Sequence, residues 1–366
     1  MPAPSIPCCL QGGSDVGFRA EVCPALRALS VAAGCGLARD CWSRFTCCVG
    51  EPPQFNIFVH ETIMRTLNHL KDIEMLGVVV VGIGVAGRVR IRDLLNPLPN
   101  SPIENLKLMG FVSRRSLGNI EHLSQITLDE ALGSDEVQAA IISVENEAHE
   151  ENVRKFLNAG KHVCVEYPVA LSVDAARELW ELADAKGKVL HVEHIELLSA
   201  EYGLLKQKVN GKELIEGTLH FTGGPLNRQR SGFLAFSGIS RLTWLVDLFG
   251  ELTLKSAIFS EDQIQQYSKM TVQFHTKNSR PVIWIEERGP GLKRGKRIYF
   301  QFKSDNLDHI PKVPNNHVGL FMKDLNLFAQ KLVGQKLTDA SEKKRILHCL
   351  GLADEIRIFC EQTPPK

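Results

Sequence analysis

The apolar positions of this chain form short, nearly continuous runs between about residues 76 and 193. The first run, 76–81, holds four consecutive valines, and similar runs follow at 108–112, 139–143, 162–165 and 189–193. Runs of this kind are typical of strands buried on both faces of a parallel sheet. Amphipathic segments between them predict helices that end before Pro97, open at Thr127, and span about 150–159 and 172–186. The alternation predicts an α/β fold with a doubly wound parallel sheet of the Rossmann type.

The pattern changes beyond about residue 196. After a helix at about 197–208, strand-like runs occur at 214–221, 252–260, 269–276, 281–287 and 297–303, with a helix at 239–249 among them. Strands that follow one another without helices predict an antiparallel sheet. Two further helices are expected near 318–333 and 341–360. We therefore expect a Rossmann domain over 74–195, and an α+β domain with a large antiparallel sheet and C-terminal helices over 196–366.

Residues 1–73 differ in composition from the rest. Seven of the ten cysteines lie in the first 48 residues, among scattered proline, glycine and serine. Their spacing, which includes two adjacent pairs, suits a metal or redox module poorly. We expect a disordered, cysteine-rich extension that derives from an upstream start codon, with Met75 near the functional start. The three cysteines that remain suit a reduced, cytoplasmic protein.

Charge and hydropathy narrow the classes of partner. The net charge of +1 argues against nucleic acid as a required partner. Apolar runs stay well below the ~20 residues that span a bilayer, so no membrane association is expected. A chain of 366 residues suits about two domains.

A glycine motif, Gly-x-Gly-x-x-Gly, follows the first predicted strand at Gly82, Gly84 and Gly87. In a strand–turn–helix context, the first glycine permits a tight turn, the second lets the backbone approach a phosphate, and the third allows close packing of helix and strand. The N-terminus of the helix then faces the anion. The sequence predicts a dinucleotide-binding turn, and a turn without ligand is the alternative. The expected contacts run through the whole turn: Gly82, Ile83, Gly84, Val85, Ala86 and Gly87.

The end of the second strand distinguishes NADPH from NADH. An acidic residue there would bind the ribose hydroxyls, whereas basic residues accommodate a 2′-phosphate. The sequence has Ser113, Arg114, Arg115 and Ser116, with no acid before Glu121. Guanidinium and hydroxyl groups bind phosphate by charge-assisted hydrogen bonds. We predict a preference for NADPH, with NADH possible and a solvated basic turn as the alternative.

From about Leu76 to Cys360 the sequence closely resembles the vertebrate biliverdin reductase A family. Wider relatives resemble glucose–fructose oxidoreductase and inositol dehydrogenase, and carry Glu-Lys-Pro where this chain has Glu166-Tyr167-Pro168. The lysine that a sugar dehydrogenase uses is thus missing. The resemblance rests on the stretches 77–87, 110–115, 158–162, 166–168, 236–246, 289–294 and 343–353.

The resemblance implies hydride transfer from nicotinamide C4 to the C10 methine of biliverdin, which gives bilirubin in heme catabolism. It places the tetrapyrrole between the nicotinamide and the antiparallel sheet. It also places NADPH contacts in the loop after the third strand, at Asn146, Glu147, Ala148 and His149, although His149 could instead cap the next helix.

Two residues are expected to serve catalysis. Tyr167 follows a buried strand, where doubly wound sheets place ligands. The resemblance puts it at the cofactor in a positioning role, since a phenol with a reference pKa of ~10 is a poor proton donor; a packed tyrosine is the alternative. The resemblance implies that Arg241 holds the substrate and assists protonation, directly or through water. Because an arginine is always charged, we expect it to orient the substrate and act electrostatically, with water or solvent as the immediate proton source. A surface arginine with its stem on Trp244 is the alternative.

A basic stretch follows Gly289-Pro290-Gly291. The substrate carries two propionates, so cations are expected around it. The resemblance favours a substrate or cofactor role for part of this stretch. A solvated turn is one alternative, and a nuclear-localisation or nucleic-acid patch is a second, less specific one. The expected substrate ligands are Arg241, Lys293, Arg294 and Arg297.

Two carboxylates after the fifth predicted strand and a histidine–cysteine group in the last predicted helix are candidates for acid catalysis and for metal binding. Glu193 or Glu196, at the end of the fifth strand, would need a raised pKa to act as a general acid; an ion pair or a solvated carboxylate is the alternative. His348, Cys349 and Cys360 resemble a family pattern that has been proposed to bind zinc. On one straight helix, however, residues eleven apart are separated by about 16 Å, so zinc is not expected.

The expected function is that of a biliverdin-reducing NAD(P)H-dependent oxidoreductase, acting as a monomer. A sugar- or inositol-type dehydrogenase is the alternative enzyme, and a non-catalytic nucleotide-binding scaffold is the alternative without catalysis.

Overall fold

A computed structural model describes residues 75–314, 318–334 and 339–362. Its first sheet is parallel and has five strands in the order β2-β1-β3-β4-β5. These strands are β1 (Leu76–Val81), β2 (Leu106–Val112), β3 (Ala139–Ile142), β4 (His162–Val165) and β5 (Leu190–Val192). The predicted doubly wound sheet is confirmed.

Both faces of this sheet are buried, as the valine run predicted. Val78 and Val80 pack with α4 (Val85–Leu95), the 3₁₀ helix η1 (Pro102–Asn105) and α12 (Leu320–Leu332). Val79 and Val81 point the opposite way, into a core built with α5 (Leu128–Gly133), α6 (His149–Asn158) and α7 (Val173–Ala185). Alternate side chains of a strand point to opposite faces, so a strand covered on both faces is apolar throughout. Helix α12 follows the second sheet in sequence but packs on the first.

The second sheet has six strands in the order β11-β10-β6-β9-β8-β7. Four of its five pairings are antiparallel, as expected, but β6 and β9 run parallel. A parallel neighbour requires a long connection, and three helices and a hairpin supply it here. The strands are β6 (Leu214–Gly223), β7 (Leu252–Asp262), β8 (Tyr267–Thr276), β9 (Pro281–Arg288), β10 (Gly295–Phe302) and β11 (Asn306–Leu307).

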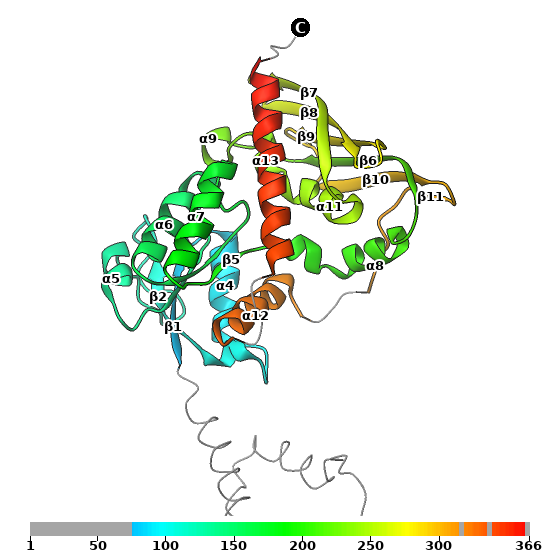
Figure 1. Cartoon of the computed structure of the whole chain (residues 1–366). Helices are drawn as coiled ribbons and strands as arrows, with labels where there is room; N and C mark the ends of the chain where they lie inside the picture. Colours follow the sequence, from blue (N-terminus) through cyan, green and yellow to red (C-terminus); the bar gives the residue numbers. More distant parts are fainter. Residues whose placement is uncertain (1–74, 315–317, 335–338, 363–366) are drawn as a thin grey trace, which may run out of the picture. The chain divides into compact units, whose positions relative to one another are not determined.

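Helices connect the two sheets and cover one face of the second. Figure 1 shows the long C-terminal helix α13 (Ala340–Gln362) between the helices of the first sheet and the strands of the second. It contacts α7, α11 and β7, so it joins the two halves of the described chain. The remaining helices are η2 (Asn146–Ala148), η3 (Ile195–Leu198), α8 (Ala200–Val209), α9 (Arg228–Ser231), α10 (Leu234–Ser237) and α11 (Ile239–Phe249).

Local signals identified most element ends. Thr127 and Glu130 form the predicted capping box at the start of α5, and Ser172 caps α7 through the N–H of Ala175. The short elements α9, α10 and β11 were not predicted. The extension 1–73 lies outside the described residues. Among the described residues, no helix is long and apolar enough to cross a membrane.

Candidate functional site

The glycine turn has the geometry that the motif requires. Gly82 adopts a φ of 92°, and its N–H donates to the carbonyl of Val112 over 2.9 Å. A Cβ on Gly87 would lie 1.9 Å from the carbonyl oxygen of Gly82, so only glycine allows helix α4 to approach strand β1 this closely. A Cβ on Gly84 would meet no protein atom within 4 Å. Gly84 therefore faces open space, where a phosphate could approach the backbone.

The turn lies where doubly wound sheets bind ligands. In a sheet with this strand order, the crevice opens between β1 and β3, at their carboxyl ends. Helix α4 begins there without a side-chain cap, so its first N–H groups remain available to an anion. Within the turn Ile83 is buried, Ala86 is half-buried and Val85 is exposed. The arrangement fits a dinucleotide pyrophosphate.

The two arginines at the end of β2 take different partners. Arg115 donates through Nη2 to the carbonyl of Ile83 over 3.2 Å, which brings its guanidinium to the glycine turn. Arg114 is exposed and pairs with Glu145 over 2.6 Å. The amide of Gln125 donates to the carbonyls of Ser113 and Arg115 and so fixes this loop. Sequence reasoning missed Glu145 and Gln125, because neither contact is local in the chain. Ser116 is exposed beside them.

The loop after β3 contacts the second half of the chain. The amide of Asn146 donates to the carbonyl of Ser231 over 3.0 Å, while Glu147 is exposed. His149 is buried, with Nδ1 2.6 Å from the carbonyl of Pro168 and Nε2 3.0 Å from that of Val144. Burial lowers the pKa of His149, and a neutral imidazole donates through only one nitrogen. His149 therefore braces this loop against the residue after Tyr167 rather than facing an open site. Ala148 is half-buried at the start of α6.

Tyr167 lies at the carboxyl end of β4, before a cis peptide bond to Pro168. Its ring lies 4.4 Å from that of His194, and its hydroxyl is 3.2 Å from the hydroxyl of Thr243. Thr243 has one proton and also lies 3.0 Å from the carbonyl of Ile239, which can only accept. The hydrogen bond between the two hydroxyls therefore holds the phenol of Tyr167 against helix α11. Burial raises the pKa of Tyr167 well above its usual value, so its proton is poorly available to a substrate.

A cavity of about 150 Å³ lies between Tyr167 and helix α11. It joins the carboxyl edge of the first sheet to the helix-covered side of the second, and it brings together Tyr167 and Arg241, as predicted. Its lining comes from four segments: Tyr167; Glu193, His194, Ile195, Glu196 and Leu197; Ser237, Ile239, Ser240, Arg241 and Thr243; and Arg294.

Arg241 is buried, with 5% of its surface exposed, and is not the surface arginine of the alternative interpretation. Its Nη2 and Nε donate to the two carboxylate oxygens of Glu286, at 2.7 and 3.2 Å. The ring of Phe221 lies 4.1 Å from the guanidinium carbon. A buried charge requires such pairing. The sequence did not reveal Glu286, because it comes from β9, 45 residues away.

Cations outnumber anions around Phe221. The guanidiniums of Arg241, Arg288 and Arg294 lie 4.1, 4.6 and 5.9 Å from its ring centre. Glu286 pairs with Arg288 as well as with Arg241, so one carboxylate neutralises two of these three guanidiniums. The excess charge suits an anionic group bound from the cavity. Sequence reasoning missed Arg288, although strand alternation puts it on the same face as Glu286.

The basic stretch before and within β10 divides between two faces of the sheet. Lys296 pairs with Glu196 and lies 3.9 Å above the ring of Trp244, on the cavity side. Because neighbours in a strand alternate, Arg297 points to the opposite face, beside its register partner His220. The structure therefore does not bring Arg297 to this cavity. Lys293 is exposed, and its carbonyl accepts a hydrogen bond from Thr222.

Glu193 has the electrostatics of an acid that stays protonated near neutral pH. Burial, with the nearby carboxylates of Glu166 and Asp324, raises its pKa to about 8. The N–H of Ile195 donates to one of its oxygens over 2.5 Å. The other titratable groups of the cavity are less suitable: burial lowers the pKa of His194 to about 4, and Glu196 is ion-paired.

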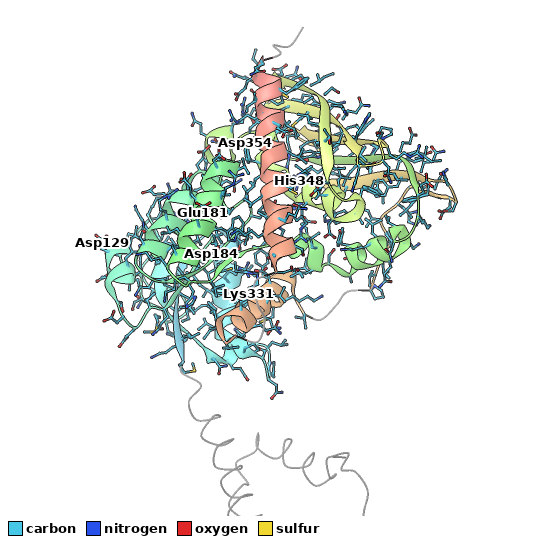
Figure 2. The ribbon with its side chains drawn as sticks, in the orientation of Figure 1. Asp129, Glu181, Asp184, Lys331, His348 and Asp354 are labelled. Atoms are coloured by element: carbon cyan, nitrogen blue, oxygen red, sulfur yellow. The ribbon has the colours of Figure 1, made fainter. Side chains whose placement is uncertain are left out.

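A buried polar chain lies behind Glu193. Arg90 contacts Glu166 at 3.0 Å and Asp324 at 2.6 Å, and Asp324 contacts Nε2 of His191 at 3.0 Å. Lys331, labelled in Figure 2, donates to Nδ1 of the same imidazole over 3.0 Å. One ligand atom from each of Cys164, His191 and Asp324 lies within 4.8 Å of the other two, a spacing that suits a metal ion. However, Asp324 is already paired with a guanidinium and an imidazole, so the group functions as an ion-pair network.

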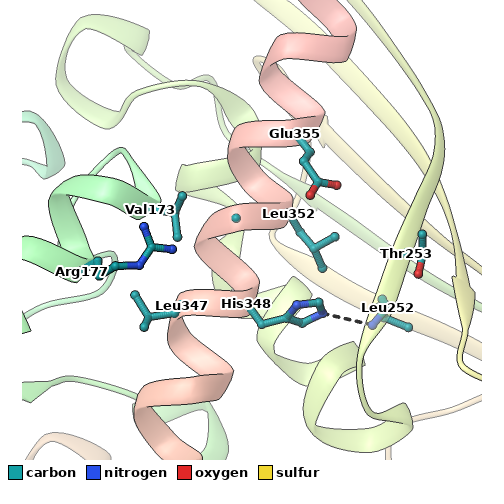
Figure 3. Close-up of a pocket in the computed structure, with 9 residues that line it drawn as sticks. Val173, Arg177, Leu252, Thr253, Leu347, His348, Leu352 and Glu355 are labelled. Atoms are coloured by element: carbon teal, nitrogen blue, oxygen red, sulfur yellow. Dashed lines mark hydrogen bonds between the residues drawn. The ribbon is translucent and has the colours of Figure 1, made fainter.

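A wider groove of about 440 Å³ runs along α13, away from the glycine turn (Figure 3). Nε2 of His348 accepts the N–H of Leu252 there. Cys349 points elsewhere, to Thr243 at 3.8 Å, and Cys360 lies three turns further along the same helix. The structure therefore does not bring the three candidate zinc ligands together.

Known protein families match both halves of the described chain. Residues 76–194 match the model of the oxidoreductase family with an NAD-binding Rossmann fold, and residues 202–314 match the model of the catalytic part of biliverdin reductase. The crystal structure of biliverdin reductase from Synechocystis sp. PCC 6803, in complex with biliverdin and NADP+, matches with a TM-score of 0.63 and 22% identity. That match covers 78% of this chain and 99% of the other.

Two curated relatives match over nearly their whole length. Human biliverdin reductase A is 58% identical over 286 residues, which are 78% of this chain and 96% of the relative. The mouse protein is 55% identical over 288 residues, with the same shares of both chains. The chain belongs to the biliverdin reductase A family.

Proposed function

We propose that this protein reduces biliverdin to bilirubin with NADPH. The observation that carries the proposal is the cavity itself, which lies at the carboxyl edge of the sheet that holds the dinucleotide-binding turn and is lined by the guanidiniums of Arg241 and Arg294. The first feature suits a nicotinamide cofactor, and the second suits the anionic groups of a flat, apolar substrate. The reductases of human and mouse, more than half identical to this chain, carry that activity in their names.

The residues that would hold the two phosphate groups of the cofactor come from the ends of β1 and β2. Backbone N–H groups at Gly84 and in the first turn of α4 bind the pyrophosphate. Arg115, whose guanidinium already reaches the glycine turn, and Arg114 bind the 2′-phosphate. NADPH bound there supplies a hydride from nicotinamide C4 to the C10 methine of the substrate. NADH would lack the contact with these two arginines and bind more weakly.

The substrate end of the cavity is built to hold propionates. Arg294 lines the cavity, while Arg241 and Arg288 share Glu286 and carry net positive charge toward it. Charge-assisted bonds to a carboxylate would orient the tetrapyrrole. Tyr167 then packs against the reacting face, because its hydroxyl is held by the hydrogen bond with Thr243.

Glu193 is the proton source that the geometry favours. Among the titratable groups that line the cavity, its pKa of about 8 is the one matched to donation near neutral pH. Arg241 cannot donate, because a guanidinium stays charged. Glu193 would protonate the pyrrole nitrogen directly or through one water, and solvent would restore its proton.

The proposal also covers the cellular compartment and the oligomeric state of the enzyme. Cys164, Cys349 and Cys360 are free thiols, and the first two are buried, which supports a reducing compartment such as the cytoplasm. We further propose that the enzyme acts as a monomer.

A direct assay tests the proposal. Purified protein is mixed with NADPH and biliverdin, and the absorbance bands of biliverdin and bilirubin are followed together. We expect the first to fall as the second rises. Parallel reactions with myo-inositol or glucose and NADP+ test the sugar dehydrogenase alternative; turnover of a sugar without turnover of biliverdin would overturn the proposal.

A further inference from the structure

One carboxylate at the cofactor crevice holds two arginines from different parts of the chain. Glu145, after β3, pairs through Oε2 with Arg114 over 2.6 Å and through Oε1 with Arg230 of α9. Because both guanidiniums contact one carboxylate, they are neighbours in space. The adjacent Asn146 also bonds α9, through the carbonyl of Ser231. A segment that leads out of the second sheet is thus tied to the edge of the cofactor site.

The same arrangement would suit a phosphate better than a carboxylate. A phosphomonoester offers three terminal oxygens and close to two negative charges, so it can accept from both arginines at once. Arg114 and Arg230 are largely exposed, with side-chain exposures of 81% and 64%, so each can turn to a new partner at little cost. Glu145 would then compete with a 2′-phosphate for both groups, and would also repel it.

We propose that Arg230 is a second ligand of the 2′-phosphate of NADPH, and that Glu145 limits the selectivity for NADPH by competing for the two arginines. The inference rests on the proposed function, because it assumes that NADPH binds at the glycine turn. It adds a cofactor contact from outside the Rossmann half of the chain. It also assigns to one acidic residue a role that the Arg114-Arg115 pair alone would not suggest.

Neighbouring Arg228 provides a matched control. It lies on the same short helix but pairs with Glu261 and lies over the rings of Phe233 and Phe259. Arg228→Ala changes the charge of α9 by the same amount as Arg230→Ala, but it removes no contact with Glu145. A long-range electrostatic effect would therefore appear equally in Arg228→Ala and Arg230→Ala, whereas a direct phosphate contact appears only in the second.

The test is the dissociation constant of NADPH and of NADH, titrated separately by nicotinamide fluorescence at fixed ionic strength. We expect Arg230→Ala to weaken NADPH about tenfold, the order of one charge-assisted contact, and to leave NADH unchanged. Arg230→Lys should recover part of the loss, and Glu145→Gln should tighten NADPH about threefold by the same arithmetic. Arg228→Ala should bind both cofactors like the wild type.

Two results would overturn the inference while leaving the proposed function intact. One is wild-type NADPH affinity in Arg230→Ala, and the other is an equal loss of NADPH and NADH in that variant. Failure of the wild-type protein to bind NADPH at all would instead overturn the cofactor assignment and, with it, the inference.

Discussion

Arg241 and Glu286 form a buried ion pair with two hydrogen bonds, Nη2 to Oε1 at 2.7 Å and Nε to Oε2 at 3.2 Å. Glu286 is fully buried and also binds Arg288. Replacing Glu286 by Ala would leave two guanidiniums without a counter-charge. We expect the free energy of unfolding, measured by urea titration, to fall by about 3–5 kcal/mol.

The adjacent residue gives the control for that loss. Glu287 pairs with Lys269 on the opposite, more exposed face. Glu287→Gln should change stability by less than about 1 kcal/mol. Equal losses in the two variants would show that the Arg241 pair has no special role in the fold.

Substitutions at two glycines of the turn should have different effects, one on the stability of the fold and the other on cofactor binding. Gly87→Ala places a Cβ 1.9 Å from the carbonyl of Gly82, so we expect a clear fall in melting temperature. Gly84→Ala meets no protein atom within 4 Å, so the melting temperature should be unchanged while NADPH binding falls at least tenfold. Calorimetry and cofactor titration check both. If Gly84→Ala bound NADPH normally, the turn would not carry the pyrophosphate.

Tyr167 should matter little for proton transfer. Its hydroxyl is hydrogen-bonded to that of Thr243, and burial raises the pKa of Tyr167 well above the usual value. We expect Tyr167→Phe, which keeps the ring against His194, to lower the single-turnover rate by no more than about tenfold, since a lost general acid typically costs 10²–10⁴-fold. A loss of about 10²-fold or more would instead make the phenol the proton donor.

Glu193 should set the alkaline limit of the reaction. With a pKa of about 8, the protonated acid is lost as pH rises through 8, so kcat should fall there with a slope approaching one decade per pH unit. Glu193→Gln should lower kcat and abolish its decrease above pH 8. If kcat of the variant still fell as pH rose through 8, the essential acid would be a different residue.

The same carboxyl affects stability with a defined sign. Its pKa is raised on folding from 4.5 to about 8, so the folded state binds the extra proton between these values. This contribution is fully present below about pH 4.5 and is lost as pH rises through 8. Unfolding titrations at several pH values should show a shallower decline in Glu193→Gln than in the wild type.

The sequence predicted those features whose physical cause is local. The valine run, the glycine turn and the capping box at Thr127 each depend on neighbours within a few residues, and each is found where expected. Tyr167 and Arg241 were assigned by resemblance, and the structure brings them to one cavity.

Long-range partners could not be read from the chain. Glu286 neutralises Arg241, and Glu145 holds Arg114, across strands that only the folded sheets bring together. The expected role of Arg297 as a substrate ligand fails for a similar reason. Alternation along β10 directs Lys296 toward Trp244 at the cavity and Arg297 to the other face of the sheet. The parallel pairing of β6 and β9 depends in the same way on the order of strands in space.

The most direct test of the central claim is isotopic. The protein is given NADPH carrying deuterium at both C4 positions, together with biliverdin, and the product is analysed by mass spectrometry and NMR. Direct hydride transfer predicts bilirubin one mass unit heavier, with deuterium at C10. Folded, NADPH-binding protein that yields no bilirubin, or bilirubin without deuterium at C10, would contradict the account.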